Sequence, residues 1–153
     1  FAEMVQYLSR EGIEAAEELL LMYITMRALQ NRRISFELIR VIFEMRLMLT
    51  EGEGLELFRC LRCGKEEVHS VYLSEGGLIC RECAAKDKKL SKEYPIVLSA
   101  DAKYTLQYIL TSTPEKLYAF TVTDSVLNEL KRFMKSYLAR YLPHKFKTLD
   151  FIV

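Results

Sequence analysis

The chain has 153 residues, half of them hydrophobic and 28% charged, with a formal net charge of +1 at pH 7. These values are typical of one soluble globular domain, and they exclude a protein that holds nucleic acid by bulk charge. The most apolar run, residues 19–24, is too short to cross a bilayer.

The first third of the chain predicts helices. Apolar residues recur at helical spacing from Phe1 to Leu8, and Gly12 should end that segment. Residues 14–31 are apolar nearly all round, which is typical of a helix buried in a bundle. Ser35 is a candidate N-cap for a third helix, which should end before Gly52.

Four cysteines form two C-x2-C pairs separated by sixteen residues: Cys60, Cys63, Cys80 and Cys83. Two thiolates at this spacing can bind one metal ion from a tight turn, and two such turns complete the tetrahedral site that suits Zn²⁺. The alternatives are two disulfides or a redox dithiol, although the βαβ pattern that usually surrounds a redox pair is absent. We expect one structural Zn²⁺ per chain, because four protein ligands leave no open position for a catalytic water. Cysteine pairs at metal spacing also favour the reducing cytoplasm.

The segment around the cysteines predicts a small ribbon. Gly64 stands where a knuckle turn tolerates a positive φ. Residues 68–73 predict a strand, residues 74–77 a turn and residues 78–79 the returning strand, and the second cysteine pair should lead into a short helix. A solvent-exposed connector follows, carrying Lys86, Lys88, Lys89 and Lys92.

The last third predicts helices again. Ser99 can cap one that Pro114 ends, and Thr123 can cap a long helix with an apolar stripe over residues 126–142. Residues 146–153 should pack back as an extended strand. The expected fold is mainly α, a helical bundle with an inserted four-cysteine, zinc-ribbon-like module. Residues 1–58 would supply the first bundle helices, residues 59–90 the zinc module, and residues 91–153 the helices and tail that complete the same bundle.

Basic residues that could bind DNA phosphates or an acidic peptide gather in two places. One set surrounds the cysteines: Arg59, Arg62, Lys65 and Arg81. The other lies near the end of the chain: Lys131, Arg132, Lys135, Arg140, His144, Lys145 and Lys147. Both have a simpler interpretation. The first set could compensate the charge of a zinc–thiolate centre, and the second could be the solvent face of an amphipathic helix.

The order of these features resembles the C-terminal region of the RecO family, bacterial recombination mediators in DNA repair. The resemblance covers essentially the whole chain. It is carried by the helical segment from Phe36, by Cys60-Leu-Arg-Cys-Gly, by Gly76-Gly-Leu-Ile-Cys-Arg-Glu-Cys, and by the basic and apolar tail from Tyr137. This chain departs mildly from the family at Thr148, where serine is usual, and at Pro143, where the helix usually continues.

The resemblance implies an N-terminal OB-fold domain outside this chain and a protein associated with the bacterial nucleoid. It implies binding to single- and double-stranded DNA, strand annealing, and docking of RecR and of the C-terminal tail of single-strand binding protein. Through these partners it implies help in loading RecA. Some members lack the cysteines, which fits a structural role for zinc.

Other classes of function leave fewer traces in the sequence. An enzyme is disfavoured, because the two histidines are far apart and no nucleophile or phosphate-loop motif is present. The alternative to a recombination mediator is a generic zinc-stapled protein-interaction module, or a redox-sensitive switch in which loss of zinc unfolds the segment.

Overall fold

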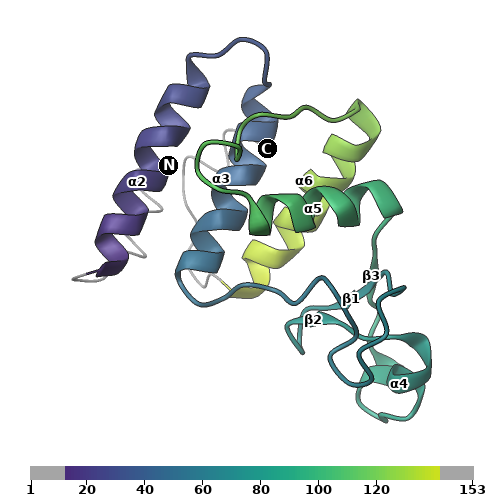
Figure 1. The fold of residues 1–153 in the computed structure, drawn as a ribbon. Helices are drawn as coiled ribbons and strands as arrows, with labels where there is room; N and C mark the ends of the chain where they lie inside the picture. Colours follow the sequence, from purple (N-terminus) through teal and green to yellow (C-terminus); the bar gives the residue numbers. More distant parts are fainter. Residues whose placement is uncertain (1–12, 142–153) are drawn as a thin grey trace.

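The computed structural model describes residues 13–141, with side chains from residue 16 onward. Within this range the fold is mainly helical, with a small sheet beside the bundle (Figure 1). No helix in the range is long and apolar enough to cross a membrane. The helix expected before Gly12 and the strand expected over residues 146–153 lie outside the described residues.

Helix α3 (Phe36–Thr50) is the centre of the bundle. It packs against α2 (Ile13–Leu29), α5 (Ala100–Thr111) and α6 (Asp124–Tyr141), as Figure 1 shows. Most of its length is buried, including Ile42, Phe43 and Met45. The described helices on either side of the cysteine segment therefore share one core.

All three predicted helix caps are confirmed. The Oγ of Ser35 accepts a hydrogen bond from the Leu38 N–H at 3.2 Å, and the Oγ of Ser99 accepts one from the Ala102 N–H at 3.1 Å. Thr123 does the same at the start of α6, at 3.4 Å. Each cap satisfies an N–H group that has no partner within its own helix.

Helix α2 differs from the prediction of a fully buried helix. Leu19 and Met26 are 66% and 59% exposed, and Leu20 and Tyr23 are exposed as well. Helix α2 packs on α3 along one narrow stripe, which consists of Glu18, Leu21, Thr25 and Ala28. The prediction was wrong because an all-round apolar pattern does not say how many neighbours a helix has, and α2 has a single main helix neighbour within the described residues.

The small sheet has three strands in the order β2-β1-β3, all antiparallel. The strands are β1 (Ser70–Tyr72), β2 (Gly77–Leu78) and β3 (Ile96–Val97). The predicted short helix is α4 (Arg81–Ala85), which begins inside the second cysteine pair and not after it. A 3-10 turn, η1 (Leu90–Lys92), follows it. Strand β3 was not predicted, because a two-residue strand has no periodic pattern and forms only by pairing with β1.

Side chains of the bundle hold this segment by its backbone. The Lys103 ammonium on α5 donates to the Glu66 carbonyl at 2.8 Å, and the Gln107 amide donates to the Leu57 carbonyl at 2.8 Å. From α6, the hydroxyl groups of Tyr137 and Tyr141 donate to the carbonyls of Glu53 and Leu73. The sheet and the cysteine turns therefore have a fixed position at one end of the bundle.

Candidate metal centre

The four cysteines meet at one point between the first cysteine turn and the start of α4. Their sulfur atoms all lie within 4.8 Å of one another, and the Sγ atoms of Cys63 and Cys80 are 3.6 Å apart. The edge of a tetrahedron of four sulfurs around zinc is about 3.8 Å, from Zn–S bonds of about 2.3 Å, whereas a disulfide would need about 2.05 Å. None of the four sulfurs is in a disulfide. The group can hold a metal ion, and its donors are those that suit Zn²⁺.

Backbone N–H groups point at the most buried sulfur. The Sγ of Cys60 accepts hydrogen bonds from the N–H groups of Arg62 at 3.4 Å and Cys80 at 3.3 Å. Burial raises the pKa of the Cys60 thiol, but the N–H groups of Cys63, Cys80 and Arg62 outweigh it and lower that pKa to about 6. The hydrogen bond from Cys83 to Cys80 raises the pKa of the Cys83 thiol to about 12. The two N–H···S bonds to Cys60 stabilise the thiolate form that a metal requires.

Two glycines shape the β1–β2 hairpin that precedes the second cysteine pair, for different reasons. Gly76 has a φ of +82°, a conformation that side chains disfavour. At Gly77 an added Cβ would lie 2.5 Å from the Glu56 carbonyl oxygen, because the two backbones form a β-bridge there. Neither the bridge to Glu56 nor the reason for the Gly-Gly pair was predicted from the sequence. The paired glycines before a Cys-x-x-Cys were the available signal.

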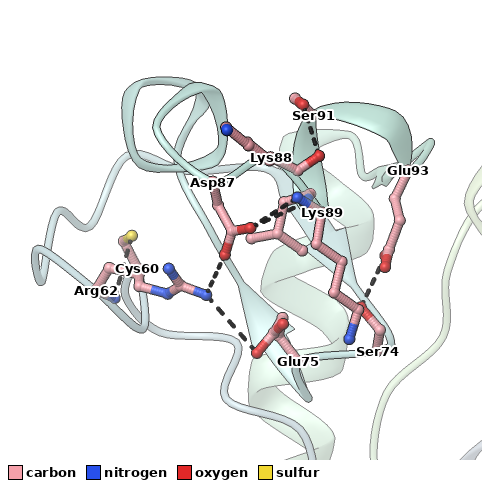
Figure 2. Close-up of polar contacts among 10 residues, drawn as sticks. Cys60, Arg62, Ser74, Glu75, Asp87, Lys88, Lys89, Ser91 and Glu93 are labelled. Atoms are coloured by element: carbon pink, nitrogen blue, oxygen red, sulfur yellow. Dashed lines mark hydrogen bonds and ion pairs between the residues drawn. The ribbon is translucent and has the colours of Figure 1, made fainter.

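The members of the first basic set, which are neighbours of the cysteines in the sequence, differ in their contacts. The side chains of Arg59, Lys65 and Arg81 are exposed and form no ion pair within residues 16–141. Arg62 forms two, with Asp87 at 3.1 Å and Glu75 at 3.8 Å (Figure 2). Arg62 therefore links the first cysteine turn to the connector after α4, while the other three remain available to a partner.

The second basic set lies on α6 where it can be described. Arg132, Lys135 and Arg140 are exposed on the face opposite the buried stripe, and Lys131 is half-buried, with its ammonium 3.7 Å from Glu37. Three further members, His144, Lys145 and Lys147, lie outside the described residues. The described part forms a basic helix face, which is the geometry that both interpretations of this set require.

A family model described as "Recombination protein O C terminal" matches residues 1–150. The chain belongs to the RecO family. It is similar to curated proteins named DNA repair protein RecO. The one from Acetivibrio thermocellus is 34% identical over 122 residues, which cover 78% of this chain and 46% of that protein. The one from Clostridium kluyveri is 25% identical over 157 residues, which cover 99% of this chain and 57% of that protein.

The chain thus spans about half the length of the curated RecO proteins that it matches. No solved structure matches it. The family assignment agrees with the resemblance identified from the motifs around the cysteines and from the two flanking helical segments.

Proposed function

We propose that this chain is the helical and zinc-binding part of a non-catalytic recombination mediator in DNA repair. The match to the RecO C-terminal family over residues 1–150 carries this proposal. In it, the chain supports binding of single- and double-stranded DNA and strand annealing. It also provides docking surfaces for RecR and for the acidic tail of single-strand binding protein, and so acts indirectly on RecA.

Within the same proposal the four cysteines hold one Zn²⁺ in a structural role. Four sulfur ligands complete a tetrahedron and leave no position for a reacting water. Four thiolates and one Zn²⁺ carry a net charge of about −2, which the neighbouring Arg59, Lys65 and Arg81 partly offset. The metal staples the two cysteine turns together, and the bundle side chains described above set their position.

The basic face of α6 is the proposed contact for DNA or for the acidic tail. Three observations support it: its cations are exposed, they share one helix face, and the opposite face is fully used in the core. Both candidate ligands are anionic, so either would gain from the same charges.

The test is annealing of complementary oligonucleotides, with and without single-strand binding protein, using this chain and the Acetivibrio thermocellus relative in parallel. The double variant Arg132→Glu/Lys135→Glu should weaken binding of DNA or of the tail peptide at least tenfold at low salt. The control Asn128→Ala/Ser136→Ala changes two exposed positions on α6 without changing charge. Equal affinity of the charge-reversed and unaltered chains, with both folded, would refute this contact.

The comparison with the relative separates two roles. Annealing by the relative but not by this chain would assign the chain to partner docking. Annealing by neither, under conditions where an established annealing protein works, would contradict the proposed function.

A further inference from the structure

The connector after α4 carries a cluster of lysines that the cysteine site does not use. It runs from residue 86 to residue 95 and contains four exposed lysines, Lys86, Lys88, Lys89 and Lys92. Within the described chain none of them has a carboxylate at ion-pair distance. A run of lysines often forms only a solvent-exposed face. Whether its positive charge is available to a ligand depends on whether nearby carboxylates pair with the lysines.

Both acidic residues of the connector have hydrogen-bond partners other than the lysine ammonium groups. The carboxylate of Asp87 accepts hydrogen bonds from the N–H groups of Lys89 at 2.9 Å and Leu90 at 3.4 Å, and it pairs with Arg62 (Figure 2). The Lys89 N–H is the main cause of the lowered pKa of Asp87, and Arg62 adds to it. Glu93 accepts a hydrogen bond from the Ser74 hydroxyl at 2.7 Å. Neither carboxylate forms an ion pair with a lysine of the connector.

An exposed aromatic residue follows these lysines in the sequence. Tyr94 is 99% exposed, the most exposed large hydrophobic residue in the described chain. It follows Lys92 closely, and Pro95 and the paired strand β3 come directly after it, which limits the freedom of its backbone. Burying such a ring would recover the free energy that its exposure to water costs.

A hollow of about 390 Å³ borders the same segment. Its lining includes Ser91 and Pro95 from the connector, together with Arg81 from α4. It therefore joins the connector to one of the exposed cations beside the cysteines. Exposed cations with an exposed ring and an adjacent hollow are the combination that proteins use to bind single-stranded nucleic acid. The cations follow the phosphates, and a base stacks on the ring.

We propose that this connector is a binding site for single-stranded nucleic acid, in which Tyr94 stacks on a base and Lys88, Lys89 and Lys92 contact the phosphates. The inference rests on the proposed function, which it deepens by naming a site for single strands that is separate from the basic face of α6.

The stacking can be observed directly, because the chain contains no tryptophan. Tyr94→Trp places one indole at the site, and an oligo-dT titration should quench its fluorescence. Heparin, which has phosphate-like charge but no bases, should not. Tyr94→Ala should weaken oligo-dT binding about 5- to 150-fold, the range for loss of one stacked base. The matched control Tyr23→Ala removes an exposed tyrosine from α2, at the far side of the bundle in Figure 1, and should have no effect.

The phosphate contacts are tested by the salt dependence of binding. Lys88→Ala/Lys89→Ala keeps the backbone N–H group that Asp87 binds, and it should reduce the slope of log K against log salt by about 1.4, or about 0.7 for each contact. The control Arg32→Ala/Arg33→Ala removes the same charge from the α2–α3 loop and should leave the slope unchanged.

The outcomes separate this inference from the proposed function. Binding of oligo-dT that is unchanged in the Tyr94→Ala and double-lysine variants would overturn the connector site alone. Quenching by heparin equal to that by oligo-dT would overturn the stacking. Failure of the unaltered chain to bind oligo-dT would overturn both the connector site and the DNA-binding role proposed for this chain.

Discussion

Glu44 is a carboxyl group buried in the middle of α3, and its replacement tests the structure of the bundle. Its side chain is only 2% exposed. One oxygen accepts a hydrogen bond from Arg40 Nε at 2.9 Å, while Oε2 has no hydrogen-bond partner among the described residues. Burial raises the pKa of Glu44 to about 7, and the neighbouring Arg40 only partly opposes the shift.

The sign of the effect on stability follows from this raised pKa. Below pH 4.5 the Glu44 carboxyl is protonated in both the folded and the unfolded chain, so it does not lower the free energy of unfolding. Between about pH 4.5 and 7 the unfolded chain releases the proton while the folded chain keeps it, so stability falls as the pH rises. Above pH 7 the loss is complete, at about 3 kcal/mol for a shift from 4.5 to about 7.

Glu44→Gln keeps an oxygen for Arg40 but cannot ionise, so it should remove this loss. We expect the variant to be more stable than the unaltered chain by up to about 3 kcal/mol at pH 8, with the difference shrinking toward pH 4. Urea unfolding followed by circular dichroism at a series of pH values measures it. Glu115→Gln, at an exposed position, is the control and should show no such trend. If the difference in stability between the two chains did not depend on pH, or if the variant were less stable at pH 8, Glu44 would not be a buried carboxyl with a raised pKa.

Two further predictions concern the cysteines and the α3–α5 contact. Cys80→Ser should abolish binding of one Zn²⁺ per chain, measured by elemental analysis, and loosen the sheet while most helical circular dichroism remains; an unchanged metal content would contradict the four-cysteine site. Arg46→Met should destabilise the chain by about 2–3 kcal/mol in urea unfolding. Arg46 Nη1 donates to the carbonyls of Ile109 at 3.2 Å and Ser112 at 2.7 Å, and the variant leaves both without that donor. A loss below about 0.5 kcal/mol would show that water replaces the guanidinium.

The parts of the fold that local chemistry specifies were predictable from the sequence. Ser35, Ser99 and Thr123 cap the helices they precede because a hydroxyl at that position bonds to the next turn. Gly64, with a φ of +78°, stands in the first cysteine turn for an equally local reason. Within each cysteine pair the spacing of the two ligands is local, and the two pairs meet as predicted because one tetrahedral metal site needs four ligands.

The parts that depend on tertiary neighbours were not predictable. The exposure of Leu19 on α2 and the pairing of β3 with β1 both depend on which segments lie nearby. The difference in ion pairing between Arg62 and Arg81 also depends on tertiary neighbours. Both are arginines beside a cysteine, yet only Arg62 has Asp87 and Glu75 within reach. Sequence alone identified the basic set but could not separate a structural cation from a free one.

That difference connects the cysteine site to the proposed nucleic-acid site. Arg62 lies between Cys60 and Cys63 in the first cysteine turn, and its guanidinium holds Asp87, whose carboxylate in turn binds the backbone of Lys89. A metal held by the four sulfurs would therefore fix the connector through a continuous chain of contacts, although no connector residue is a ligand. In the structural role proposed for it, a Zn²⁺ at the four sulfurs would help to give the connector lysines a constant position relative to the first cysteine turn.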